Sequence, residues 1–164
     1  MAIQPRRFLH RLAIIALLTA SLSSPMTEAE SAKQRPIVIA HRGASGYLPE
    51  HTLPAVTAAH MLGADYIEQD IVLSADNVPM VLHDIHLEST TDVAQRFPDR
   101  ARDDGRFYAI DFTLEELKSL SVTERRTTDG AAVFATRFPV MDLGLRIPTL
   151  AEEIALIRGL NQSR

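Results

Sequence analysis

The apolar positions of the first half of the chain predict two strands around a helix. A β-branched run at residues 37–40, ending in front of Gly43, predicts a short, fully buried strand. Residues 53–63 are rich in alanine and predict a helix, for which Thr52 supplies an N-cap. Residues 64–74 then alternate between apolar and polar side chains, which is typical of a second strand.

A turn and a third strand follow this unit, after which the regular pattern stops. The letters "ADN" favour a turn, and residues 78–83 predict a strand that ends at His83. The chain from 85 to about 112 is polar, charged and without a period, which predicts a long excursion from the compact core. Residues 121–146 predict a second irregular stretch.

Two further helices are predicted from their capping signals. The segment "TLEELKSL" begins with Thr113 and carries Glu116 three positions later, which predicts a helix with a capping box. The segment "IPTLAEEIALIRGL" repeats this box with Thr149 and Glu152. The second helix has an apolar stripe at helical spacing, formed by Leu150, Ile154, Ile157 and Leu160.

Composition narrows the classes of function. The chain has 164 residues, which is enough for one ordinary domain. Its formal net charge of -4 argues against nucleic acid as the main partner. The sequence contains no cysteine, so it has neither a disulfide nor a thiolate nucleophile. The oligomeric state stays open at this point.

Residues 1–29 predict a secretory signal peptide. Three arginines precede the apolar run "LAIIALLTA", and small polar residues follow it. This run is shorter than the about 20 residues that span a bilayer, so we expect no stable membrane insertion. Cleavage is expected near Ala29, with Ala32 as the alternative, and an amphipathic or core helix is the other interpretation. A cysteine-free exported chain fits a bacterial periplasm.

Candidate chemistry lies where the predicted strands end. Glu68 and Asp70 are two positions apart on one strand, so their carboxylates point to the same side. Two such carboxylates repel each other unless a cation lies between them, and oxygen ligands suit Mg²⁺ or Ca²⁺. A solvated edge strand with two surface acids is the alternative interpretation.

Two histidines flank this carboxylate pair. His41 and His83 each follow an apolar strand, and sites of α/β folds gather at the carboxyl ends of parallel strands. Histidine can give or take a proton near neutral pH, although a single such residue is more often structural. Arg42 carries a planar fork that suits phosphate oxygens, or an ordinary salt bridge, and Glu50 is a further acid nearby.

The order and spacing of four motifs resemble a known family. "HRG" after a strand, then "PEHT", then "E-x-D" and then "HD" resemble the glycerophosphodiester phosphodiesterase family. The segments "AHRGASGYLPEHTLPA" and "GADYIEQDIVLSADNVPMVLHD" are most similar to its periplasmic branch, which cleaves deacylated phospholipids. The resemblance runs from about residue 37 to the C-terminus and implies a TIM-barrel fold.

The resemblance also implies a role for each matching residue. His41 and His83 match the acid/base pair of the family, and the resemblance does not say which is which. Glu68 and Asp70 match two metal ligands, with Ca²⁺ favoured over Mg²⁺. Arg42 matches a phosphate contact.

Two further regions take their expected roles from the same resemblance. Glu50 matches a residue at the metal and substrate cluster and is a further candidate ligand. The excursion at about 85–112 matches an insertion at the barrel mouth that shapes the glycerol pocket. The expected reaction is hydrolysis of a small glycerophosphodiester, such as glycerophosphocholine or glycerophosphoethanolamine. It gives sn-glycerol 3-phosphate and an alcohol, as part of glycerol and phospholipid catabolism.

The chain is short for the fold that the resemblance implies. A TIM barrel takes about 250 residues, and this sequence lacks the "PEIK"-like segment in which the family carries a third acidic ligand. We therefore expect residues 30–164 to be the N-terminal βα units of a partial barrel. Parallel strands with uncovered edges and faces predict poor stability and weak or no activity for this polypeptide alone.

Two other functions compete with the metal-dependent enzyme. A non-catalytic periplasmic module that binds glycerophosphodiesters would explain the missing third carboxylate. A related lipid-cleaving enzyme would need an exposed apolar rim, whereas the excursion is charged. The charged excursion favours a water-soluble diester as the substrate.

Overall fold

A computed structural model of the chain describes residues 35–134 and 144–162. By its internal contacts the chain divides into two units, Met1–Arg35 and Pro36–Arg164, and every described helix and strand belongs to the second. In the two described ranges no helix is both long and apolar enough to cross a bilayer. The expected signal peptide at 1–29 lies outside the described residues, so its prediction stays untested.

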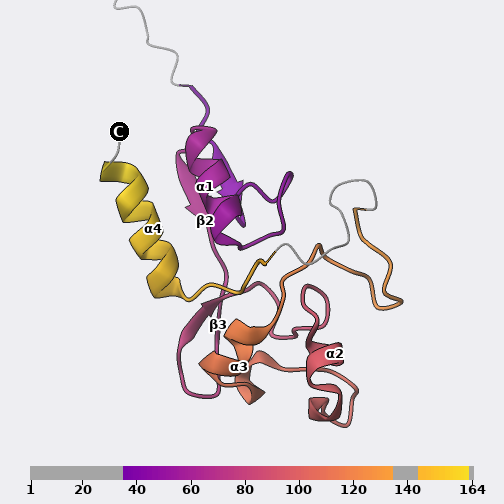
Figure 1. The fold of residues 1–164 in the computed structure, drawn as a ribbon. Coiled ribbons are helices and arrows are strands. Elements are labelled where there is room, and N and C mark those ends of the chain that lie inside the picture. Colours follow the sequence, from indigo (N-terminus) through magenta and orange to yellow (C-terminus); the bar gives the residue numbers. More distant parts are fainter. Residues whose placement is uncertain (1–34, 135–143, 163–164) are drawn as a thin grey trace, which may run out of the picture. The chain divides into compact units, whose positions relative to one another are not determined.

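The first predicted unit is a parallel pair of strands joined by a helix (Figure 1). Strand β1 (Ile39–His41) pairs in parallel with β2 (Tyr66–Glu68), and helix α1 (Leu53–Met61) connects them. The register sets His41 opposite Glu68, so the last residues of the two strands are neighbours. This is the arrangement that a strand, helix, strand order favours.

Local signals determine where α1 begins and ends. The Thr52 side chain accepts a hydrogen bond from the Ala55 amide at 3.4 Å, which makes Thr52 the N-cap as predicted. Pro54 lies in the first turn, where its missing amide hydrogen is not needed. After the helix, Gly63 adopts a positive φ of 81°.

The prediction that the first strand is fully buried is wrong for the described residues. Ile37, Val38 and Ile39 are 67%, 52% and 60% exposed. In the described part of the chain, β1 has a single neighbouring strand, β2. A strand in a parallel sheet is buried only when both its edges and both its faces are covered, so these apolar side chains lie open.

The predicted strand at 64–74 is interrupted. Gln69 and Asp70 separate β2 from strand β3 (Ile71–Leu73), and β3 pairs in antiparallel fashion with β4 (Pro79–Val81). The alternation of apolar and polar residues continues through this break, but β2 pairs with β1, whereas β3 pairs with β4. The chain therefore leaves one sheet and enters another at the last two residues of the "E-x-D" motif.

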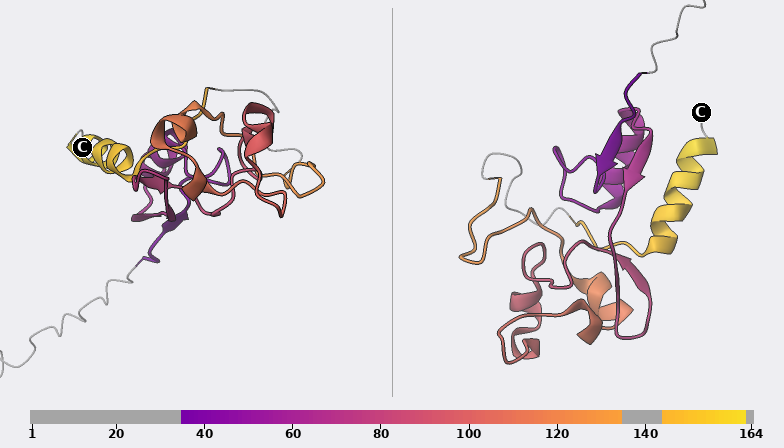
Figure 2. Two further views of the ribbon diagram at one scale, coloured as in Figure 1. Left: turned by 90° about the horizontal axis from the view of Figure 1, so that it is seen from below. Right: turned by 180° about the vertical axis from the view of Figure 1, so that it is seen from behind.

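The segment after β4 builds the main core and is not an excursion from it. It contains the short helix α2 (Val93–Arg96) and the 3-10 helices η1 (Pro98–Arg100) and η2 (Ala109–Asp111), followed by α3 (Leu114–Ser119). In Figure 2 the orange helix α3 lies beside the β3–β4 hairpin, and η2 contacts β3. The buried core cluster consists of Met80, Leu82, Leu87, Val93, Phe107, Ala109, Phe112, Leu117, Leu120, Val122 and Ile147.

The irregular spacing of these apolar residues explains why the sequence pattern failed. Short helices and isolated bridges, such as His86 with Tyr108 and Thr91 with Val122, bring them together without a period of two or 3.6. The charged residues between them pair with one another at the surface, as Arg102 does with Asp111 at 2.7 Å. A charged, aperiodic segment can therefore still bury a core.

Both predicted capping boxes are present. Thr113 and Glu116 form the first, at the start of α3. Thr149 and Glu152 form the second, with the Glu152 amide donating to the Thr149 hydroxyl at 3.1 Å and the Thr149 amide donating back at 2.8 Å. A capping box depends on only four consecutive residues, so the sequence pattern was sufficient to predict both.

Helix α4 (Leu150–Gln162) packs against α1, but not through a buried apolar stripe. None of the four stripe residues is buried, and Ile154 is exposed. The buried residue of the helix is Glu153, whose carboxylate accepts a hydrogen bond from the Gln69 side chain. Its other oxygen, Oε2, has no hydrogen-bond partner among the described residues.

The turn after β1 approaches the backbone of α1 closely. Gly43 has a positive φ of 79°, and the Ala44 amide donates to the Ala55 carbonyl at 2.9 Å. A Cβ at Gly43 would lie 3.0 Å from the carbonyl carbon of Ala55. Glycine is therefore required here for its conformation and for its lack of a side chain.

We expect Gly43→Ala to destabilise the fold by about 1–3 kcal/mol, because alanine would be strained at this φ and would press on the backbone of α1. The free energy of unfolding from urea titration measures the effect. Gly46→Ala is the matched control, since nothing lies within 4 Å of the added Cβ. Equal stability of the two variants would contradict the prediction.

We expect the contribution of Glu153 to stability to fall as the pH rises from 4.5. Burial raises the pKa of Glu153 above its usual 4.5 and outweighs the hydrogen bond from Gln69, which lowers it. Folding therefore favours the neutral carboxyl, and this contribution to stability is lost as the pH rises through the folded pKa.

Glu153→Gln keeps a neutral side chain of the same shape, so it should lose less stability over this range. Thermal melts from pH 4.5 upward measure the difference, and Glu115→Gln on exposed helix surface is the control. Parallel pH curves for the wild type and Glu153→Gln would refute this account.

Candidate active site

The ends of β1 and β2 bring the first two expected site residues together. His41 Nε2 lies 4.0 Å from Glu68 Oε2, and the backbone amide of Arg42 donates to the same oxygen at 3.0 Å. His41 is largely exposed, so its ring is open to a ligand. This proximity follows from the parallel register, in which both residues are the last of their strands.

Arg42 lies among the carboxylates of the site. Its Nη1 donates to Glu50 Oε1 at 3.0 Å, and its Nε is 3.6 Å from Asp70 Oδ2. Its φ of 59° is left-handed, which is uncommon for a residue with a long side chain. Such backbone strain persists only where surrounding contacts hold it, and it is concentrated at functional sites.

His51 has the same unusual backbone and holds Asp70. It is 3% exposed, with a φ of 58°, and its amide donates to the Arg42 carbonyl at 3.1 Å. Its Nε2 lies 3.0 Å from Asp70 Oδ2, and because a carboxylate only accepts, Nε2 is the donor. Burial lowers the pKa of His51 despite the opposing effect of Asp70, which favours the neutral ring.

Glu50 lies between two guanidinium groups. Arg125 donates from Nε to Glu50 Oε2 at 3.0 Å and from Nη2 to Oε1 at 2.6 Å, and Arg42 holds Oε1 from the other side. Burial alone would raise the pKa of Glu50, but the hydrogen bonds and charges of the two arginines lower it. In this structure the carboxylate is therefore an anion that anchors two cations.

Asp84 joins Arg125 to His83. Arg125 Nη1 and the Ser89 hydroxyl donate to Asp84 Oδ2 at 2.6 and 2.9 Å, and His83 Nδ1 lies 2.5 Å from Oδ1. Burial would raise the pKa of Asp84, but the hydrogen bonds from Arg125, His83 and Ser89 lower it to about 2. With Nδ1 engaged by Asp84, the Nε2 atom of His83 is left for other partners.

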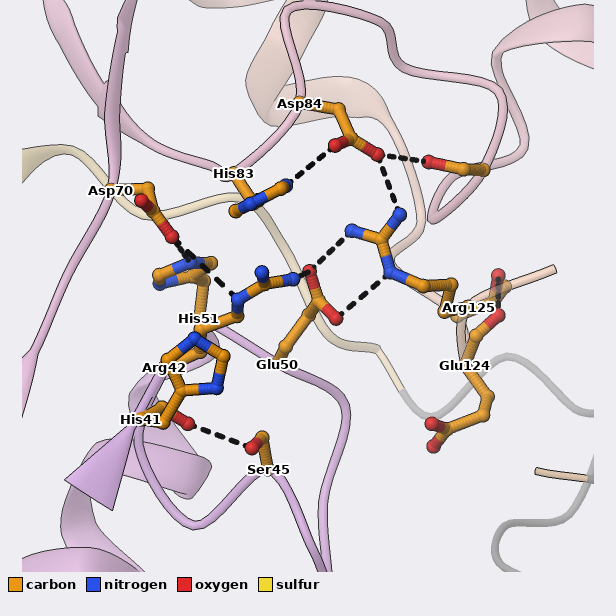
Figure 3. A network of polar contacts seen from close by, with 12 residues as sticks. His41, Arg42, Ser45, Glu50, His51, Asp70, His83, Asp84, Glu124 and Arg125 are labelled. Atoms are coloured by element: carbon orange, nitrogen blue, oxygen red, sulfur yellow. Dashed lines mark hydrogen bonds and ion pairs between the residues drawn. The ribbon is translucent and has the colours of Figure 1, made fainter. Parts of the chain in front are cut away.

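All six expected site residues belong to one continuous network of polar contacts, most of which is visible in Figure 3. His83 joins it by a different route than predicted, because β4 is antiparallel to β3 and ends two residues earlier. The link runs through Asp84 and Arg125. These contacts show the residues together but do not test their assigned roles.

Three titratable members of the network were not among the expected site residues. His51 and Asp84 lie inside the "PEHT" and "HD" motifs, so the motifs themselves were the signal for them. Arg125 comes from the second irregular stretch, 75 positions from Glu50 and 41 from Asp84. No local pattern marks it, because only the folded chain brings it to the site.

Two carboxylates of the site have the chemistry of metal ligands. Glu68 and Asp70 offer hard oxygen donors beside Arg42. Within residues 35–134 and 144–162, no group of three or more His, Asp or Glu side chains could hold a metal ion. The described residues therefore supply at most part of a coordination sphere.

Comparison with known proteins assigns the family. The profile of the Glycerophosphoryl diester phosphodiesterase family matches residues 41–163. The chain belongs to this family. It is 50% identical over 134 residues to a glycerophosphodiester phosphodiesterase of Haemophilus influenzae and 47% identical over 130 residues to one of Treponema pallidum. These matches cover 80% and 77% of this chain but 37% and 36% of the relatives.

Solved structures agree on the fold. A glycerophosphodiester phosphodiesterase from Agrobacterium tumefaciens has a TM-score of 0.57 at 28% identity, over 77% of this chain and 44% of that one. An Oleispira antarctica phosphodiesterase in complex with the product sn-glycerol-3-phosphate has a TM-score of 0.54 at 33% identity, over 76% and 41%. The fold is therefore α/β and corresponds to part of a TIM barrel, as expected.

We expect Asp84→Asn to remove a component of acid sensitivity. The pKa of Asp84 is lowered from 3.8 to about 2, so its contribution is present above pH 3.8 and lost as the pH falls through about 2. The loss should amount to roughly 1 kcal/mol in the wild type, after allowance for solvent screening.

Urea unfolding between pH 5 and pH 2 measures this loss. The exposed Asp99→Asn variant is the control and should follow the wild type. A wild-type curve that runs parallel to that of Asp84→Asn through this range would rule out the assigned contribution.

Proposed function

We propose that this chain carries the acid/base and phosphate-binding half of a glycerophosphodiester phosphodiesterase. The observation that carries the proposal is the single polar network joining His41, Arg42 and His83. Family membership supports the reaction class. The chain spans a little over a third of the length of these two curated relatives. The activity of the whole enzyme is therefore a proposal for this chain.

The proposed reaction is hydrolysis of a small glycerophosphodiester, with glycerophosphocholine and glycerophosphoethanolamine as examples. The products are sn-glycerol 3-phosphate and the free alcohol. The product complex of the Oleispira antarctica relative supports this choice of product. Such a reaction serves glycerol and phospholipid catabolism.

Each of the two histidines and Arg42 has a separate role in the proposed reaction. His83 is held at Nδ1 by Asp84, so its Nε2 would exchange a proton with the substrate. His41, which is exposed beside Glu68, would carry out the second proton transfer. One of the two would deprotonate the nucleophile, a water molecule or the neighbouring glycerol hydroxyl, and the other would protonate the leaving alkoxide. Arg42 would neutralise charge on a phosphate oxygen.

Glu68 and Asp70 would hold a divalent cation, with Ca²⁺ preferred to Mg²⁺. The donor chemistry fits, because both side chains offer oxygens beside the position proposed for the phosphate. Ca²⁺ takes about 6–8 oxygen ligands, so two carboxylates supply only part of the set. Such an ion would neutralise charge that develops on the phosphate. Glu50 is a weaker candidate ligand, since both of its oxygens already bind guanidinium groups.

We propose a periplasmic location and membership in the periplasmic branch. The basic and apolar pattern of residues 1–29 supports export, and the absence of cysteine is compatible with it. Residues 85–112 would form the insertion that shapes the glycerol pocket, while their apolar side chains pack in the main core.

A non-catalytic module that binds glycerophosphodiesters is the second candidate. The incomplete carboxylate set in the described residues favours it. Retention of both histidines disfavours it, because binding alone does not need two proton-transfer groups.

Release of glycerol 3-phosphate from glycerophosphocholine tests the proposed function. We expect the chain to release it only weakly, because its parallel strands have uncovered edges and faces, and we expect this release to need Ca²⁺ and to stop with EDTA. His41→Ala and His83→Ala should each lower kcat by at least about 100-fold, because each removes a proton-transfer group.

His60→Ala is the matched control, because His60 lies on α1 and bonds to Asn161. Binding of glycerophosphocholine without turnover, measured by calorimetry, would favour the binding module. Release that is unaffected by both histidine variants would overturn the proposed mechanism.

A further inference from the structure

The Arg125 side chain makes three hydrogen bonds to two carboxylates of the network. All three nitrogens of its guanidinium donate to carboxylates, two to Glu50 and one to Asp84, at 2.6–3.0 Å. The two acids contact different parts of the site. Glu50 also binds Arg42, and Asp84 also binds His83. Arg125 is therefore the only link between these two halves among the contacts drawn in Figure 3.

The shape of the guanidinium makes this link possible. A planar fork can take both oxygens of one carboxylate while a third N–H reaches another acid. A lysine ammonium is a compact point charge and cannot reproduce that geometry. The Arg125 side chain is 21% exposed, so its contacts are partly shielded from water and are worth more than surface pairs.

We propose that Arg125 is a positioning residue that fixes the Arg42 guanidinium and the His83 imidazole relative to each other through Glu50 and Asp84. The inference rests on the proposed function, in which His83 transfers a proton and Arg42 binds phosphate. Arg125 acts at a distance, since the contacts that join it to both residues run through carboxylates.

The tautomer of His83 reports directly on this role. With Asp84 accepting from Nδ1, the neutral ring carries its hydrogen on Nδ1 and leaves Nε2 unprotonated. Without the Arg125 fork, Asp84 keeps only its contacts with Ser89 and His83 and is free to turn. Both tautomers of His83 should then be populated.

The decisive experiment compares Arg125→Lys with the wild type in the full chain. Nitrogen-15 NMR at a pH above the imidazole titration range identifies the His83 tautomer, with His83→Gln used to assign the signal. We expect the Nδ1–H tautomer in the wild type and a mixture in Arg125→Lys. Where turnover is measurable, kcat should fall about 10- to 100-fold, as expected for a displaced catalytic group.

Arg126→Lys is the matched control, because Arg126 binds the Gly130 carbonyl and lies outside the network. It should leave both the tautomer and kcat unchanged. If Arg125→Lys fails to fold, the Glu50→Gln variant tests the inference instead. It weakens the hydrogen bonds that hold Arg125 and changes no residue in direct contact with His83. In that variant we also expect mixed tautomers.

The inference is overturned if His83 lacks the Nδ1–H tautomer in the wild type, or keeps it unchanged in the deciding variant. A wild type without turnover would count against the proposed function, whereas the tautomer would still decide the role of Arg125. The two proposals can therefore fail separately.

Discussion

Charge compensation around Glu50 is the constraint on which the site depends. Its carboxylate lies between Arg42 and Arg125, and the same two arginines also face Asp70 and Asp84. Carboxylates packed this closely would repel one another, and burial would raise their pKa values, if cations did not alternate with them. The alternation keeps Glu50 and Asp84 ionised, and it holds the long arginine side chains in single orientations.

The network draws on backbone geometry as well as on charge. Arg42 and His51 both have left-handed backbones, and a hydrogen bond between their main chains ties the two together. Gly43 lets this strained turn lie against α1. The switch from β2 to β3 places Asp70 where Arg42 and His51 can both reach it. Two of the three described non-glycine residues with positive φ, Arg42 and His51, therefore shape the site, and the third, Asn77, lies in the β3–β4 turn.

The main core stabilises the site from the side of Asp84 and Arg125. Leu82 and Leu87 of the core cluster flank the "HD" motif in sequence, and Val122 precedes Arg125 by three positions. The Arg126 amide donates to the Ser89 carbonyl at 2.7 Å, which ties these two segments together. The aperiodic stretches after β4 therefore position the half of the network that contains Asp84 and Arg125.

The sequence by itself determined the features that depend on a few consecutive residues. The N-cap of α1, the capping boxes at Thr113 and Thr149, and the motifs that contain the site residues all belong to this class. The order of four motifs also sufficed to identify the family, because motif spacing is a property of the chain and needs no knowledge of packing.

Only the tertiary structure decided which residues are covered and which distant groups meet. In the folded chain β1 is exposed, and α4 buries Glu153 and not an apolar stripe. The aperiodic segment after β4 contributes side chains to the core. The tertiary structure also brought Arg125 to Glu50 and Asp84. Burial and long-range ion pairs depend on what packs beside a segment, and a local pattern carries no information about a partner that lies tens of residues away.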